Sequence, residues 1–116
     1  MQYDLEERTA KFGEQIILFC RALQKDEIAK SLINQLIRSA TSIGANYMEA
    51  NHGSSKKDFS NKISLCLKES NETKHWLRMI ATAIDEEKEK CRFFGKEAHE
   101  LTLIFATILK SCKKHD

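Results

Sequence analysis

Apolar residues recur along the chain at helical spacing in four separate segments. In each segment the steps alternate between three and four residues, which places the side chains on one face of a helix. The four stripes are Leu5, Thr9, Phe12, Ile16, Phe19 and Leu23; Ile33, Leu36, Ala40, Ile43, Tyr47 and Ala50; Phe59, Ile63, Cys66, Ser70, Thr73, Leu77, Ile80 and Ile84; and Cys91, Phe94, Ala98, Leu101, Phe105, Ile108 and Cys112. The pattern predicts helices over about residues 5–24, 27–51, 56–84 and 86–113.

Polar residues at the predicted helix starts support these boundaries. Asp4, Asp26 and Ser55 each precede a stripe, and an oxygen at this position accepts hydrogen bonds from the free amides of the first turn. Gly53 follows the second stripe, and glycine readily closes a helix in the left-handed conformation.

Composition favours one all-α domain. The chain has 116 residues, no proline and only four glycines, so little interrupts long helices. Four helices of similar length with short connections favour antiparallel neighbours. We therefore expect residues 1–116 to form a single antiparallel, up-down-up-down four-helix bundle.

Charge and hydropathy limit the compartment and the partners. The 19 basic and 17 acidic residues give a net charge of +2. This charge is far below the strongly basic balance expected of a dedicated nucleic-acid-coating protein. No apolar run approaches the roughly 20 residues that span a bilayer, and residues 1–7 do not resemble a signal peptide. We expect a cytoplasmic protein with no membrane partner.

The sequence offers no clear metal site or catalytic centre. Two Glu-x-x-His motifs, Glu49 to His52 and Glu72 to His75, have the spacing used by di-iron bundles. In an antiparallel pair of helices they would lie roughly 21 Å apart, too far to share a metal. The four cysteines form no C-x-x-C pair, and no glycine-rich phosphate loop is present. We expect no enzyme, no catalytic residue, no cofactor, no metal and no small-molecule substrate.

A polar row follows one side of the second predicted helix. Arg38, Ser42, Asn46 and Glu49 are spaced by four, four and three residues, so their side chains lie close enough to interact. One interpretation is a structural network in which Arg38 pairs with Glu49 or with Glu69 or Glu72 of the next helix. The other is a contact with a ligand or RNA.

The third predicted helix is rich in lysine. Residues 31–83 hold seven basic and four acidic side chains, an excess of three positive charges. The candidate nucleic-acid contacts are Lys56, Lys57, Lys62 and Lys68. Such a strip could follow phosphates, although ordinary solvated helix faces look similar and no aromatic residues alternate with these lysines.

Some large apolar residues fall outside the four stripes. Leu65, Trp76 and Met79 project away from the stripe of the third helix, and Leu103 does so on the fourth. Exposed apolar clusters often mark an interface, and tryptophan is a common anchor. We expect these four residues to mediate self-association; a wider monomer core is the alternative.

Two segments carry a family resemblance. The segment from Ile37 to Glu49, with Arg38, Ser42-Ile43, Asn46 and Glu49 in that order, and the segment from Ser55 to Phe59 resemble the 23S rRNA intervening-sequence proteins. The likeness extends through the stretch from Leu65 to Glu72 and the leucine-containing last helix.

The resemblance implies a four-helix bundle that assembles into a homopentameric ring. Proteins of this family are ribosomal-protein-like and are similar to the accessory protein of diversity-generating retroelements, which binds a reverse transcriptase and nucleic acid. The resemblance therefore implies an RNA-binding or accessory scaffold. A protein-only assembly module with no nucleic-acid role is the alternative, and a metal-binding or catalytic bundle is a third.

Overall fold

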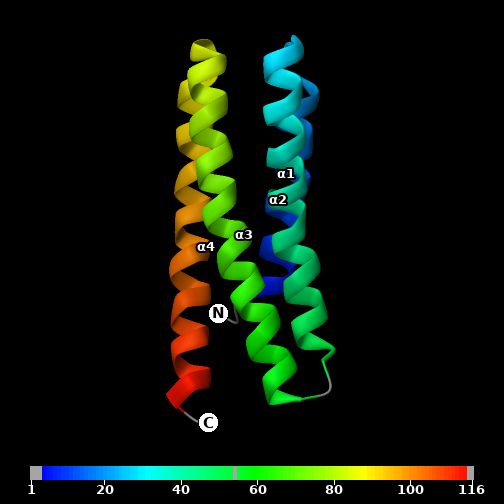
Figure 1. The fold of residues 1–116 in the computed structure, drawn as a ribbon, viewed down its shortest axis with the longest axis vertical. Helices are drawn as coiled ribbons and strands as arrows, with labels where there is room; N and C mark the ends of the chain where they lie inside the picture. The colour runs from blue at the N-terminus through cyan, green and yellow to red at the C-terminus, as the bar shows by residue number, and fades with distance from the viewer. Residues whose placement is uncertain (1–3, 54, 115–116) are drawn as a thin grey trace.

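The protein is a bundle of four α-helices. The computed structural model describes residues 4–53 and 55–114, a part of the chain that contains no strand. The elements are α1 (Leu5–Arg21), α2 (Glu27–Asn51), α3 (Lys56–Ala83), a short 3₁₀ helix η1 (Asp85–Glu87) and α4 (Lys88–Lys114). Successive helices run in opposite directions along a molecule that measures 47 × 25 × 21 Å (Figure 1). The predicted all-α four-helix bundle is confirmed, and its assembly into a ring stays a prediction.

Side-chain caps begin the first three helices, as the sequence predicts. The Asp4 carboxylate accepts a hydrogen bond from the amide of Glu7 at 3.1 Å, and Asp26 accepts one from Ala29 at 2.8 Å. The Ser55 hydroxyl accepts from the amide of Asp58 at 3.0 Å. Each cap satisfies one amide that the first helical turn leaves without a partner.

Two helix ends differ from the expected ones. α1 ends at Arg21 rather than near residue 24, although Leu23 remains buried beyond its end. α2 closes at His52 with φ −109°, and Gly53 does not adopt a positive φ. The expected left-handed glycine cap is wrong, because the amides of His52 and Gly53 already bond to carbonyls of the last turn.

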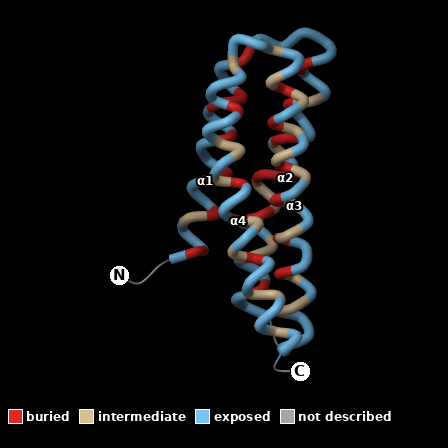
Figure 2. Tube along the Cα trace, turned by 90° about the vertical axis from the view of Figure 1, so that its left-hand side faces the viewer, coloured by how far each residue is buried: buried red, intermediate tan, exposed pale blue. Residues whose placement is uncertain are grey.

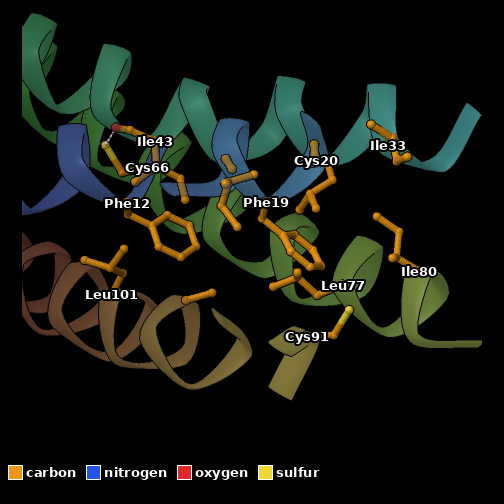
Figure 3. Packing of buried hydrophobic residues seen from close by; sticks show 14 of the residues in the cluster. Phe12, Phe19, Cys20, Ile33, Ile43, Cys66, Leu77, Ile80, Cys91 and Leu101 are labelled. Atoms are coloured by element: carbon orange, nitrogen blue, oxygen red, sulfur yellow. Dashed lines mark hydrogen bonds between the residues drawn. The ribbon is translucent and has the colours of Figure 1, made fainter. Parts of the chain in front are cut away.

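The predicted stripes form the core. Their central members are buried, with Ile16, Leu36, Ile43, Ile63, Ile80, Leu101 and Phe105 fully enclosed. Buried positions follow the inward side of every helix (Figure 2). Figure 3 shows Phe12 and Phe19 of α1 directed toward the side chains of α3 and α4. Half-buried Tyr47, Phe59, Phe94 and Ile108 extend the stripes toward the edges of this cluster.

α1 is the shortest helix and leaves part of the bundle with three helices. It has 17 residues, against 25, 28 and 27 in α2, α3 and α4. At 1.5 Å per residue the longer helices exceed α1 by roughly 12 to 16 Å. The end of the molecule near the α2–α3 connection is therefore built from α2, α3 and α4 (Figure 1).

Candidate functional site

Arg38 joins α2 to two carboxylates of α3. Its Nη2 donates to Oε1 of Glu72 at 2.6 Å, and its Nη1 donates to Glu69 at 3.3 Å. Hydrogen bonding to Glu72 is the largest of the causes that raise the pKa of Arg38, and the charge of Glu69 also contributes. The guanidinium is thus held between two anions that lie three residues apart on one side of α3.

The rest of the polar row satisfies its own helix. The Ser42 hydroxyl donates to the carbonyl of Arg38 at 2.6 Å, and the Asn46 amide donates to the carbonyl of Ser42 at 2.9 Å. Glu49 accepts from Lys62 of α3 at 2.6 Å, not from Arg38. The row thus joins α2 to α3 at two places, through the two ion pairs of Arg38 and the single pair of Glu49 with Lys62, with backbone-bonded side chains between them. This arrangement matches a structural role.

A buried hydroxyl pair lies beneath the Arg38 ion pairs. Thr73 Oγ1 donates to Ser39 Oγ at 2.9 Å, and both side chains are fully buried. The Ser39 hydroxyl donates to the carbonyl of Leu36, and Thr73 Oγ1 also lies 2.8 Å from the carbonyl of Glu69. Because Thr73 has one hydroxyl proton, it donates either to Ser39 or to the carbonyl of Glu69 at any moment. The predicted core stripes include Thr73 but not Ser39. Ser39 lies three residues after Leu36 and four before Ile43, and this helical spacing is the signal that could have revealed its burial.

A second ion cluster, which the sequence did not predict, joins α1 to α4. Arg8 donates to Glu97 at 2.6 Å through both Nε and Nη2, and to Glu100 at 2.9 Å. Hydrogen bonding to Glu97 is the largest cause that raises the pKa of Arg8. Such a bidentate pair fixes the relative position of the two helices more firmly than a single contact would.

The predicted lysine contacts divide into two kinds. Lys62 is bound to Glu49, so its charge is partly neutralised within the bundle. Lys56, Lys57 and Lys68 are exposed, and none of them forms an ion pair with the residues that the structure describes. These three charges are available to an anionic partner.

The predicted interface residues differ in exposure. Leu65 and Leu103 are 37% and 54% exposed. Trp76 and Met79 are half-buried, and Trp76 packs against the core of the single chain. The expectation that a lone bundle exposes Trp76 is wrong, because its position continues the Glu69 and Glu72 row on the side of α3 that α2 covers. Self-association through these four residues stays a prediction.

Burial makes the interior cysteines unreactive. Cys20, Cys66 and Cys91 are buried free thiols, and Cys112 is half-buried. Desolvation raises the pKa of Cys20 and Cys91 to about 11 and that of Cys66 to about 12. Cys20, which lies off the predicted stripe, is nevertheless buried where α1 packs against its neighbours.

The two Glu-x-x-His motifs serve separate contacts. Glu49 binds Lys62 and Glu72 binds Arg38, so neither carboxylate is free to approach the other motif. No group of three or more His, Cys, Asp or Glu side chains gathers within residues 4–53 and 55–114 in a way that could hold a metal ion. None of the described helices is long and apolar enough to cross a membrane.

Fold and surface together define an all-helical bundle protein with ion-paired helix seams and a lysine-bearing α3. A family model described as 23S rRNA-intervening sequence protein matches residues 1–107. The chain therefore belongs to the 23S rRNA-intervening sequence protein family.

A solved structure supports the same assignment. A crystal structure from Bacteroides thetaiotaomicron, described as a protein with unknown function from the S23 ribosomal protein family, is 30% identical to this chain. The match covers 90% of this chain and 94% of that one, with a TM-score of 0.82. Among curated proteins, none matches the chain.

Proposed function

We propose that this protein is a non-enzymatic, cytoplasmic scaffold that self-associates and presents the lysine-bearing side of α3 to RNA. The observation that carries the proposal is the trio of exposed lysines, Lys56, Lys57 and Lys68, which make no ion pair with any described residue. The polar row on α2 is assigned a structural role.

The spacing of the lysines suits an extended anion. Lys57 and Lys68 are eleven residues apart, which is close to three full helical turns, so they lie on the same side of α3 at a separation of roughly 16 Å. Phosphates bound there would displace condensed counterions, which gives affinity without sequence specificity. Such binding is expected to weaken steeply as salt is added.

The family supports RNA as the partner. Its description refers to the 23S rRNA intervening sequence, and the similar crystal structure is assigned to the S23 ribosomal protein family. The resemblance to family members that form homopentamers, and to the accessory protein of diversity-generating retroelements, extends the proposal to a ring-shaped adaptor. In such a ring, the α3 lysines of each copy would repeat around the assembly.

Charge reversal tests the RNA proposal. The double variant Lys57→Glu with Lys68→Glu should bind a hairpin RNA at least about tenfold more weakly than the wild type at low salt, because two phosphate contacts are lost. Filter binding at two ionic strengths measures this loss. The slope of log K against log salt concentration should also become shallower, by the amount that corresponds to about two lost phosphate contacts.

A matched control separates the α3 surface from total charge. Lys11 and Lys30 are exposed on α1 and α2, so Lys11→Glu with Lys30→Glu changes the net charge equally. This control should retain most of the affinity. Absence of RNA binding by the wild type at low salt, or equal losses in the two double variants, would refute the proposal.

A protein-only assembly module is the second candidate function. The exposed side chains of Leu18 and Phe93, 65% and 66% accessible, line a hollow of about 440 Å³ between α1 and α4. Apolar side chains at such a site favour a protein partner over a nucleic acid. Purification from the native cell distinguishes the two candidate functions. The protein-only module requires that a protein partner co-purifies and remains bound after nuclease treatment, and that no RNA co-purifies.

A further inference from the structure

A cationic hollow lies at the end of the bundle opposite the α2–α3 connection. It lies between the last turns of α3 and the first turns of α4 and has a volume of about 560 Å³. Its lining residues are Lys74, Leu77, Arg78, Ala81, Thr82, Asp85, Lys88, Cys91, Arg92 and Gly95. Lys56, Lys57, Lys62 and Lys68 do not line it, so the hollow is separate from the lysines of the proposed RNA surface.

The charges around the hollow are strongly unbalanced. Four cations line it against one acid, Asp85. Of the other acids nearby, Glu87 lines the hollow on the α1–α4 side. Glu89 pairs with the lining residue Arg92 at 2.6 Å and partly neutralises it. The side chains that line the recess therefore carry four positive charges and one negative charge, in a chain whose net charge is +2, and Glu89 offsets part of the charge of Arg92 from outside the lining.

The existing contacts of these cations are weak enough to exchange. The pair of Lys88 with Asp85 is long, at 3.9 Å, and the pair of Arg92 with Glu89 is short, at 2.6 Å, but all four side chains are exposed to solvent. Exposed pairs of this kind contribute little to stability, because water screens the charges. Arg78 has no ionic partner within the described part of the chain. Its guanidinium is free to bind an oxyanion in the bidentate manner that phosphate favours.

Gly95 is an independent indication that the recess is kept open. Glycine inside a helix is destabilising relative to alanine, because its backbone loses more conformational freedom on folding. Close helix packing, as at Gly44, is a usual reason to accept that cost, but a Cβ at Gly95 would meet nothing within 4 Å. The residue lines the hollow, so the missing side chain leaves room there that any other residue would fill.

The floor of the hollow is apolar. Leu77 and Cys91 are buried at its base, and Ala81 is half-buried beside them. A volume of about 560 Å³ is also far larger than one inorganic anion needs and lies within the range of organic-ligand sites. The ligand should thus combine several negative charges with an uncharged organic part.

From the charge, the open glycine position and the apolar floor, we infer that the α3–α4 hollow binds a phosphate-bearing organic ligand, with Arg78 and Arg92 as the principal phosphate contacts. Two sources share this chemistry, a free nucleoside polyphosphate and the backbone of an RNA strand. In the second case the inference rests on the proposed function and adds a second contact region to it.

The test uses the full chain and three probes. Calorimetric titration with ATP and with tripolyphosphate measures free polyphosphate binding, and fluorescence anisotropy with a labelled twelve-nucleotide RNA measures strand binding. The double variant Arg78→Gln with Arg92→Gln should weaken binding at least about tenfold, because two sets of charge-assisted hydrogen bonds to phosphate are lost. Arg21→Gln with Lys25→Gln, two exposed cations at the end of α1 and in the loop after it, is the matched control and should change affinity less than about threefold.

A steric variant repeats the test without changing charge. Gly95→Leu places a side chain into the hollow and should also weaken binding at least about tenfold, while circular dichroism and the melting temperature show a folded bundle. Binding of ATP that is tighter than that of tripolyphosphate, and that both variants lose, identifies a free nucleoside polyphosphate as the ligand. Binding of RNA alone that both variants lose identifies the strand.

Three results would overturn the inference. The first is that the wild type binds none of the probes, and the second is that both hollow variants still bind. The third is that the Arg21 and Lys25 control loses as much affinity as the arginine pair. If RNA binding is lost only when Lys57 and Lys68 are reversed, the proposed function stands and the hollow is not its site.

Discussion

Burial determines the chemistry of Cys66 in the core of the bundle. Its thiol is fully enclosed and donates to the carbonyl of Ile43 at 3.6 Å (Figure 3). Ionisation would place a thiolate among apolar side chains, so desolvation raises the pKa of Cys66 from 9.0 to about 12. Cys66 therefore has a structural role, because the nucleophilic thiolate would form only when the bundle opens.

This shift predicts a loss of stability in alkali. The folded state keeps the proton of Cys66 between pH 9 and about 12, whereas the unfolded state releases it above pH 9. The free energy of unfolding should therefore be unaffected by this group below pH 9 and should fall above it, by up to about 1.4 kcal/mol per pH unit. Urea unfolding followed by circular dichroism from pH 7.5 to 10.5 measures the slope.

Cys66→Ala provides the control for that slope. The variant should be less stable at neutral pH, because a cavity replaces the sulfur, but its stability should decline less steeply above pH 9 than that of the wild type. Equal slopes in the two proteins would show that Cys66 does not carry the effect.

Single residues also show what the sequence could and could not reveal. Asp26 and Ser55 were identifiable as caps because their partners lie three residues along the chain. Arg8 and Glu97 are 89 residues apart, and nothing near either residue marks the other. Arg38 is intermediate between these cases: the helical spacing limited its partners to Glu49, Glu69 or Glu72, and only the packing of α2 on α3 selected the last two.

At the scale of the helices, Gly44 and Gly95 both lie well inside a helix, away from its ends. The space beside them differs: Gly44 faces another helix closely and Gly95 does not. A Cβ at Gly44 would lie 3.4 Å from the backbone carbon and oxygen of Thr9 in α1. A Cβ alone would therefore touch α1 at ordinary contact distance, and a longer side chain would meet the backbone of α1. Gly95 of α4 meets nothing within 4 Å.

Leucine substitutions should separate helix propensity from packing. Both changes gain about 0.8 kcal/mol of propensity. Gly95→Leu should keep most of this gain and raise the melting temperature by a few degrees. Gly44→Leu should lower stability by about 1–3 kcal/mol or more, because a rigid backbone blocks the added side chain. Thermal unfolding of both variants checks the contrast, and destabilisation by Gly95→Leu as large as that by Gly44→Leu would contradict it.

Helical periodicity predicted the elements well because each stripe repeats over several turns, and the buried positions follow those stripes. Periodicity could not predict the surroundings of Trp76. The direction of a side chain around its own helix axis does not show how much of that side a neighbouring helix covers. The α3–α4 hollow was equally hidden, since Arg78 and Arg92 lie on different helices and meet only after the bundle forms.

On the scale of the whole molecule, the single chain leaves apolar surface in contact with water. Leu65 and Leu103 lie on α3 and α4 outside the core, and Ile28, Leu18 and Phe93 are exposed elsewhere. Because α1 is short, one end of the bundle contains α2, α3 and α4 among the helices of residues 4–53 and 55–114. Scattered exposed leucines are normal in a monomer, so a direct mass measurement has to decide whether these residues are covered by other copies.

Light scattering of the pure protein at micromolar concentration should give a mass of about five times the 13.4 kDa of one chain, the stoichiometry that the family resemblance implies. Leu65→Glu with Leu103→Glu should reduce this mass while helicity is retained, because charges at exposed positions disturb an interface more than a core. Trp76→Glu is a poorer test, because the half-buried ring packs against the core and its loss would unfold the monomer as well.

The control variant Asn34→Glu adds an acidic residue to the exposed surface of α2 and should leave the mass unchanged. A wild-type mass of one chain would show that the exposed leucines are ordinary surface, and an unchanged mass in the double leucine variant would place the interface elsewhere on the bundle.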